Sequence, residues 1–253
     1  MRIIGIVQAR MASSRLYGKV MKEIAGKPML YHVVERARRA EMLDDVVVAT
    51  TTEGDDDALE TYCLGMDYPC YRGSLHDVLD RFYRAAIKYQ ADCVVRFTAD
   101  CPLLDPGVVD HTISEFLRTG VDFAANRLPP PLKRTYPIGL DTEVCTFSGL
   151  ERAWKEAAEK HEREHVMPYF YNSPGRYKIL RVDHDIDYGN KRWTVDTSED
   201  LALVRLIFEQ FKGRLDFSWL EVLDLVTRQP ELETLNAGIQ HKTYLDVDGR
   251  SLE

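Results

Sequence analysis

Runs of apolar residues alternate with amphipathic segments through the first half of the chain. Three continuous runs, rich in β-branched residues, occupy residues 2–8, 45–50 and 93–98. Because these runs have no polar face, they are typical of strands covered on both sides in a parallel sheet. The segments between them repeat apolar residues at helical spacing, and we expect helices at residues 28–37, 57–66, 77–90 and 106–119. The alternation predicts an α/β fold with a doubly wound, mostly parallel sheet, which binds ligands at the carboxyl ends of its strands.

The rhythm changes after about residue 123. Residues 128–134 read Leu-Pro-Pro-Pro-Leu-Lys-Arg, and consecutive prolines exclude a helix or a central strand because they lack amide donors. This segment predicts a loop or projecting arm inserted in the fold. Beyond it we expect two strands and three helices, at residues 140–147, 178–182, 148–161, 198–211 and 218–228 respectively.

Length and charge limit the possible classes of protein. At 253 residues, the chain has the length of one α/β domain plus an arm. We expect a domain at residues 1–211 with its arm at about 127–192, and a C-terminal helix and tail at 212–253 packed on it. The formal net charge of −8 argues against a partner such as nucleic acid or an anionic membrane, because both require a basic face.

Cysteine usage and the start of the chain indicate a compartment. The five cysteines are odd in number and contain no C-x-x-C pair, which favours reduced thiols. The apolar start is too short for a signal peptide, and no apolar run has the length of a membrane span. These features predict a cytoplasmic protein.

A loop of cations and small polar residues follows the first predicted strand. Residues 8–19 contain three cations and two hydroxyls, namely Arg10, Ser13, Ser14, Arg15 and Lys19. Cationic forks and backbone amides at the end of a parallel strand suit a polyanion such as a nucleoside triphosphate. The phosphate motifs G-x-x-x-x-G-K-[ST] and G-x-G-x-x-G are both absent, so a solvated basic loop remains an alternative.

Two aspartates are candidate metal ligands. Asp100 follows the run at 93–98, ahead of a turn stiffened by Pro102. A carboxylate there suits Mg²⁺, which prefers one or two carboxylates with phosphate oxygens, although an aspartate that caps the turn gives the same pattern. Asp196 precedes a predicted helix start, and capping explains the polar residues at 197–200 without explaining Asp196 itself.

The order of these motifs resembles the CMP-sugar synthetases, cytidylyltransferases that activate acidic sugars, and above all their spore-coat polysaccharide (SpsF-like) relatives. The family's opening, A-R-x-x-S-x-R-L-x-G-K followed by G-K-P-M-[IL], corresponds to residues 9–19 and 26–30. Its strings [GA]-D-x-P-L-[IL] and V-D-T-x-E-D-L are similar to residues 99–104 and 195–201. The resemblance spans about residues 1–211 and departs from the family beside the Gly-Lys pair, where proline is common.

The resemblance implies a Rossmann-like nucleotidyltransferase that transfers CMP from CTP to a sugar acceptor with Mg²⁺ as cofactor. It implies that Arg10, Arg15 and Lys19 act on the triphosphate as catalytic residues and that Asp100 and Asp196 hold the metal. The implied nucleotide-binding residues are Ala9, Arg10, Ser13, Ser14, Arg15, Lys19, Asp100 and, beside the cytosine, Arg72. A nucleotidyltransferase for a sugar 1-phosphate or phosphonate, a metal-dependent glycosyltransferase and an inactive nucleotide-binding subunit remain alternatives.

Three further residues are assigned to the acceptor side of the site. Asp141 and Glu143 lie in residues 137–144, which resemble an SpsF-type strand. His165 lies in residues 163–169, which resemble the family's R-E-H-V-x-P-Y segment. A structural role is equally open for each of the three side chains.

The same region contains a zincin-like H-E-x-x-H string at residues 161–165. Its charged surroundings are untypical of the buried helix of a zinc protease, so we do not assign that function.

We also expect a homodimer, with residues 128–136 contributing to the interface or to the mouth of the neighbouring site. A proline-stiffened extension loses less entropy on docking than a flexible loop. The related synthetases use this region of the chain to pair, as the resemblance implies. A surface loop over the protein's own cleft is the alternative.

Overall fold

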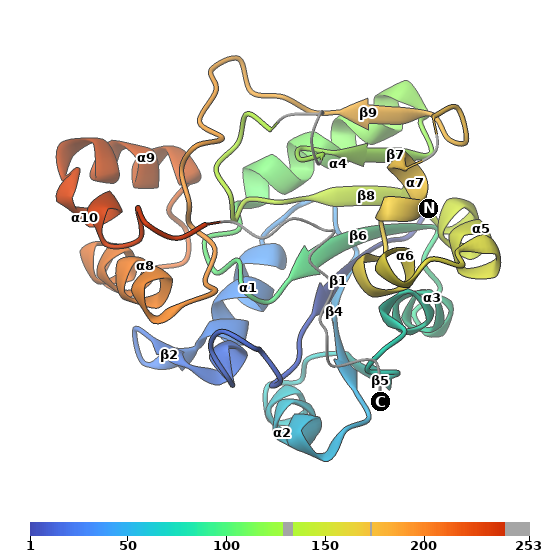
Figure 1. Ribbon diagram of the computed structural model, residues 1–253, viewed down its shortest axis with the longest axis horizontal. Helices are drawn as coiled ribbons and strands as arrows, with labels where there is room; N and C mark the ends of the chain where they lie inside the picture. Colours follow the sequence, from blue (N-terminus) through green and yellow to red (C-terminus); the bar gives the residue numbers. More distant parts are fainter. Residues whose placement is uncertain (129–133, 173, 241–253) are drawn as a thin grey trace.

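Seven strands form one mostly parallel sheet in the computed structural model, which describes residues 1–128, 134–172 and 174–240 (Figure 1). In spatial order the strands are β5 Cys70–Gly73, β4 Asp45–Thr51, β1 Ile3–Gln8, β6 Cys93–Thr98, β8 Glu143–Thr146, β7 Phe123–Ala125 and β9 Ile179–Arg181. Strand β8 is antiparallel to both of its neighbours, and the other pairs are parallel. The predicted mostly parallel α/β fold is therefore confirmed.

Helices cover both faces of this sheet. The helices are α1 Met29–Ala37, α2 Asp57–Gly65, α3 Val78–Lys88, α4 Pro106–Thr119, α5 Phe147–Glu156, α6 Lys160–His165, α7 Pro168–Tyr171, α8 Ser198–Gln210, α9 Trp219–Arg228 and α10 Glu231–Thr234. In β1, Ile4 and Ile6 join the apolar cluster that also contains side chains of α3 and α5, whereas Ile3 and Val7 join the cluster of α1, α4 and α8. This two-sided burial explains why the strand is apolar from Ile3 to Val7.

Capping residues fix where several helices begin. Asp105 accepts a hydrogen bond from the Val108 amide at 3.0 Å, directly before Pro106 in the first turn of α4. Thr197 and Asp200 form a capping box at the start of α8. Each arrangement satisfies amides that the helix itself leaves without partners.

The sequence prediction missed the short strands. The expected strand at 140–147 is only the four residues of β8, and β5, β7 and the two-residue pair β2 Glu23–Ile24 with β3 Lys27–Pro28 were not predicted. All residues of β5 are only half-buried, so this edge strand has neither an alternating nor a continuous apolar pattern. Short strands at the sheet margin depend on pairing with a neighbour rather than on a periodic signal.

The expected helix at 148–161 is confirmed over 148–156 but is wrong at its end, because α5 ends at Glu156 and α6 begins at Lys160. Arg163 donates a hydrogen bond to the Trp154 carbonyl at 2.7 Å and forms an ion pair with Asp77 at the start of α3. These tertiary contacts favour a turn where local propensity would continue the helix.

The C-terminal helices pack on the same core. Trp219 and Val226 of α9 and Leu232 of α10 belong to the apolar cluster of α1 and α8, on the left in Figure 1. Within the described ranges, no helix is both long enough and apolar enough to cross a membrane. Residues 129–133, which belong to the proline-rich segment at 128–134, lie outside the described residues, as do 241–253.

Candidate active site

The site lies where β1 and β6 end side by side at the same edge of the sheet. Asp100 follows β6 by two residues, and the segment that carries Asp196 is docked against its backbone. The Val195 amide and the Thr194 hydroxyl donate to the Asp100 carbonyl at 2.8 and 3.1 Å. Behind this segment stands Gly139, whose φ is +109° and whose position would bring an added Cβ to 2.8 Å from the Thr194 nitrogen. Only glycine fits this close approach of two chain segments.

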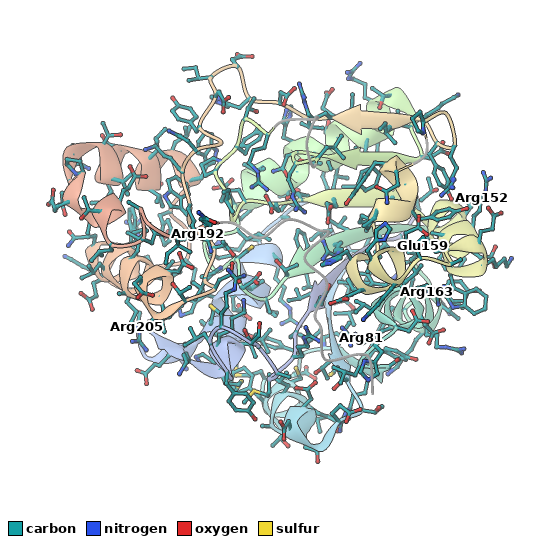
Figure 2. The ribbon with its side chains drawn as sticks, in the orientation of Figure 1. Arg81, Arg152, Glu159, Arg163, Arg192 and Arg205 are labelled. Carbon is teal, nitrogen blue, oxygen red and sulfur yellow. The ribbon has the colours of Figure 1, made fainter. Side chains whose placement is uncertain are left out.

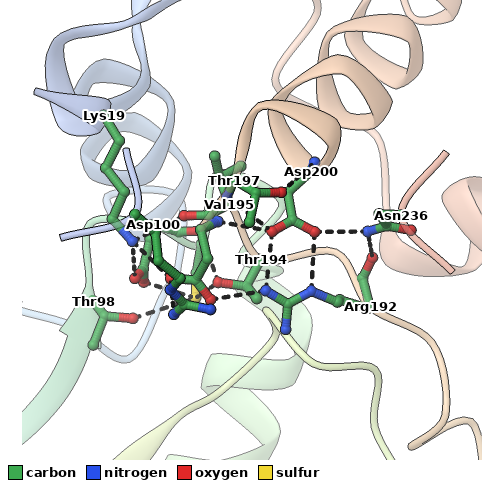
Figure 3. Close-up of polar contacts among 12 residues, drawn as sticks. Lys19, Thr98, Asp100, Arg192, Thr194, Val195, Thr197, Asp200 and Asn236 are labelled. Atoms are coloured by element: carbon green, nitrogen blue, oxygen red, sulfur yellow. Dashed lines mark hydrogen bonds and ion pairs between the residues drawn. The ribbon is translucent and has the colours of Figure 1, made fainter. Parts of the chain in front are cut away.

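Lys19 occupies the centre of the site (Figure 3). Its Nζ donates to Asp100 Oδ2 at 2.8 Å, to Asp196 Oδ1 at 2.9 Å and to the Val195 carbonyl at 2.9 Å. Burial by itself would lower the pKa of Lys19, but Asp100 and Asp196 raise it above its ordinary value. Against its own burial, Asp100 has a lowered pKa because the Lys19 charge stabilises the carboxylate. The pKa of Asp196 is lowered as well, so Lys19, Asp100 and Asp196 are all charged at neutral pH.

Asp196 is held from both of its oxygens. Arg15 Nη2 lies 2.7 Å from Oδ1, the same oxygen that accepts from Lys19. Arg192 Nη2 donates to the other oxygen, Oδ2, at 2.8 Å. The structure thus brings together four of the predicted residues, Arg15, Lys19, Asp100 and Asp196, and adds Arg192, which the sequence reasoning missed.

The rest of the cationic loop is pinned by backbone contacts. The Ala9 amide donates to the Ala49 carbonyl at 3.1 Å, and the Gly18 amide donates to the Met11 carbonyl at 2.9 Å. Buried Asp56 accepts from the Met11 amide at 2.7 Å, a role that no sequence signal suggested. The loop thereby keeps a fixed shape around its outer residues, which are Arg10, half-buried Ser13 and exposed Ser14.

Arg72 lies apart from this ion cluster, on the edge strand β5. Its guanidinium is 2.7 Å from both Asp57 Oδ1 and Glu60 Oε2, and its Nε donates to the Thr51 carbonyl at 2.7 Å. The structure thus shows Arg72 joining β5 to α2. Its place beside a cytosine stays a prediction.

The three acceptor-side residues meet a group of arginines. Asp141 Oδ1 pairs with Arg134 at 2.9 Å, and Glu143 forms an ion pair with Arg96. Arg127 lies 3.9 Å from Asp141 Oδ2 and 4.0 Å from Glu143 Oε1.

His165 belongs to the same region. Burial, followed by the charges of Arg96 and Arg127, lowers the pKa of His165 to about 4. Its Nε2 is buried and finds no hydrogen-bond partner among the described residues. The imidazole is therefore neutral at pH 7 and lies in a positive potential.

This shift makes stability depend on pH. Between about pH 4 and the ordinary pKa of 6.5, His165 binds a proton in the unfolded chain but stays neutral in the folded protein. The contribution of His165 to the free energy of unfolding is therefore complete above pH 6.5 and is lost as the pH falls toward 4. We expect His165→Gln to lose less stability than the wild type between pH 7 and 4.5 in urea unfolding. Exposed His111→Gln is the matched control. Parallel curves for wild type and His165→Gln would contradict the assigned pKa shift.

The two aspartates suit a magnesium ion best when a substrate adds further ligands. Across the described residues, no group of three or more His, Cys, Asp or Glu side chains could hold a metal, and this includes the H-E-x-x-H segment. Asp100 and Asp196 form a smaller set of hard oxygen ligands, which suits Mg²⁺ when phosphate oxygens complete its coordination. The Lys19 ammonium between them shows that the carboxylates already share a cation.

Comparisons with known proteins identify the family of the chain. A family model described as cytidylyltransferase matches residues 4–228. The chain is 34% identical over 251 residues to the uncharacterized protein MJ1063 of Methanocaldococcus jannaschii, covering 98% of this chain and 100% of that one. It is 30% identical over 243 residues to the spore coat polysaccharide biosynthesis protein SpsF of Bacillus subtilis, covering 92% and 97%.

Partial and structural matches extend the comparison. A 3-deoxy-manno-octulosonate cytidylyltransferase of Geobacter sulfurreducens is 38% identical over 116 residues, which is 45% of each chain. The solved structure of a cytidylyltransferase from Leptospira borgpetersenii has a TM-score of 0.88 and 30% identity, covering 95% of this chain and 100% of that one. A CMP:2-keto-3-deoxy-manno-octonic acid synthetase complexed with CTP, at TM-score 0.63 and 20% identity, shares the fold.

Proposed function

The chain belongs to the cytidylyltransferase family, and we propose that it transfers CMP from CTP to a sugar acceptor with release of pyrophosphate. The observation that carries this proposal is the convergence of Arg15 and Lys19 on Asp100 and Asp196 at the carboxyl ends of β1 and β6. Two cations beside two carboxylates can serve a triphosphate and a divalent cation at once.

The chemistry requires positioning and charge neutralisation more than covalent catalysis. An acceptor oxygen forms a bond to the α-phosphorus, and the bond from that phosphorus to the β-phosphate oxygen breaks. Arg10, Arg15 and Lys19 bind phosphate oxygens and stabilise the charge of the departing pyrophosphate. Mg²⁺, when held by Asp100 and Asp196, supplies further neutralisation of the phosphates.

We propose that the acceptor is an acidic sugar used for a surface polysaccharide. Among the ion pairs of the described residues, three arginines, Arg96, Arg127 and Arg134, pair with two carboxylates, Asp141 and Glu143, on the proposed acceptor side. The lowered pKa of His165 supports a positive potential in the same place. The name of SpsF refers to spore coat polysaccharide biosynthesis, and that of the Geobacter sulfurreducens relative refers to the acidic sugar 3-deoxy-manno-octulosonate.

Thermal unfolding with nucleotides tests the proposal. We expect CTP with Mg²⁺ to raise Tm more than ATP, GTP or UTP, because a ligand stabilises the folded state in proportion to the logarithm of its saturation. At a ligand concentration of 100 times Kd, the free energy of unfolding rises by about 2.7 kcal/mol. Each kcal/mol raises Tm by roughly 2–4 °C in a protein of this size. Equal shifts with all four nucleotides would remove the preference for cytidine and favour another nucleotidyl transfer. No shift with any of them would contradict nucleotide binding at this site, and the proposed transfer with it.

Two further properties belong to this proposal. We propose a homodimer, which light scattering across a range of protein concentrations would show as twice the chain mass of 29.1 kDa. We propose a cytoplasmic location, which is supported by the five cysteines being free thiols.

A further inference from the structure

A second layer of charged residues surrounds Asp196. Arg192 contacts Asp200 with two nitrogens, Nε to Oδ1 and Nη2 to Oδ2, both at 2.9 Å. The same Nη2 reaches Asp196 Oδ2 at 2.8 Å. Asp200 in turn accepts from the Asp196 amide at 2.9 Å. The backbone and the side chain of Asp196 are therefore both fixed by one ion pair. This pair joins Arg192 to Asp200, both of which are labelled in Figure 3.

The C-terminal part of the chain completes this layer. Asn236, which follows α10, donates to the Arg192 carbonyl at 3.0 Å and to Asp200 Oδ1 at 2.8 Å. The exposed fractions of Arg192, Asp200 and Asn236 are only 8%, 0% and 5%. A buried network whose members are all paired holds its geometry rigidly. Capping alone, the sequence interpretation of Asp200, accounts for only part of its contacts.

Arg192 and Asp200 can hold Asp196 without cancelling its negative charge. Arg192 and Asp200 neutralise each other, so Asp196 keeps its negative charge toward the site. Arg192 takes only Oδ2 and leaves Oδ1 facing Arg15 and Lys19. One carboxylate oxygen is thus anchored and the other is aimed at the ligands.

We propose that Arg192, clamped by Asp200 and Asn236, is a positioning residue that orients Asp196 toward the metal and the triphosphate. This inference rests on the proposed function, because it assumes that Asp196 contributes to a divalent cation site. Partners behind a metal ligand commonly change metal affinity by 10–100-fold when they are removed.

Mn²⁺ binding to the enzyme in the presence of CTP, followed by electron paramagnetic resonance, tests the inference. We expect Arg192→Gln to weaken Mn²⁺ binding by about 10–100-fold, while CTP affinity without metal changes by less than about twofold. Arg192→Lys should recover part of the loss, because it restores the charge but not the two-nitrogen contact. Asn236→Ala, which leaves every charge in place, should give a smaller loss in the same direction if Arg192→Gln does not fold.

Arg205→Gln is the matched control. Arg205 is exposed on α8 and donates to the Glu23 carbonyl, away from Arg192, as Figure 2 shows. A lower Tm with unchanged Mn²⁺ affinity in Arg192→Gln or Asn236→Ala, or tighter Mn²⁺ binding, would overturn the positioning role.

Asp196→Asn separates this inference from the proposed function. If Asp196→Asn weakens Mn²⁺ binding and the Arg192 and Asn236 variants do not, the positioning role alone is wrong. If Asp196→Asn also leaves Mn²⁺ binding unchanged, the metal role of Asp196 is wrong, and the inference is wrong with it.

Discussion

Asp100→Asn and Asp196→Asn are each expected to lower turnover by about 10²–10³-fold or more. Each substitution keeps the size of the side chain but removes a charge that we assign to the metal site. The carboxylates also neutralise buried Lys19, so the free energy of unfolding should fall by about 1–3 kcal/mol, which leaves the protein folded. Pyrophosphate release from CTP, with 3-deoxy-manno-octulosonate as the first acceptor to try, gives the rate, and thermal unfolding gives the stability.

A surface aspartate supplies the control for these variants. Asp224 is exposed on α9 and pairs with Arg228, so Asp224→Asn removes the same charge far from the site. Its turnover should equal that of the wild type. Near-normal turnover in Asp196→Asn would contradict its role as a metal ligand and leave it only a structural role before the start of α8.

Lys19→Met is expected to abolish most turnover and to destabilise the protein. Lys19 is the only side chain that bonds both Asp100 and Asp196 among the contacts described, and without its ammonium the buried carboxylate of Asp196 and the half-buried carboxylate of Asp100 repel each other. We expect a loss of about 3–5 kcal/mol in unfolding free energy, as is typical when one partner of a buried ion pair is removed. Millimolar Mg²⁺ without nucleotide should restore part of this stability, because a divalent cation replaces the missing charge.

Thermal unfolding of Lys19→Met with and without Mg²⁺ measures both effects. Lys27→Met, at an exposed position in β3, should show neither the loss nor the recovery. If Mg²⁺ stabilised the wild type and Lys19→Met equally, the ion would bind somewhere other than between the two carboxylates.

The central strands were predictable because burial on both faces leaves a continuous apolar pattern. β1, β4 and β6 were found at nearly their observed bounds, and the resemblance to cytidylyltransferases is confirmed by the family match. The edge strand β5 carries no such pattern, and β7 is apolar and buried but only three residues long, so neither gives a recognisable signal in the sequence. The end of α5 depends on Arg163, a contact from another part of the chain that no local propensity contains.

The candidate site also contains residues that the sequence predicted and one that it did not. Motif order suggested that Asp100 and Asp196 act together, and the structure places both on Lys19. Arg192 was missed because it stands between two motifs and its role appears only when Asp200 and Asn236 are folded around it. A basic residue four positions before an aspartate that precedes a helix is the one signal that could have pointed to it.

The ion cluster joins residues that are synthesised at very different times. Lys19 bonds Asp100 across 81 residues of chain but bonds Asp196 across 177. Closing the longer loop adds only about 0.6 kcal/mol for each doubling of length, so entropy scarcely separates the two contacts. Synthesis does separate them, since the ribosome needs about 5–20 s to pass from residue 100 to residue 196. The charge balance around Lys19 is therefore complete only after Asp196 has been synthesised, several seconds later than Asp100.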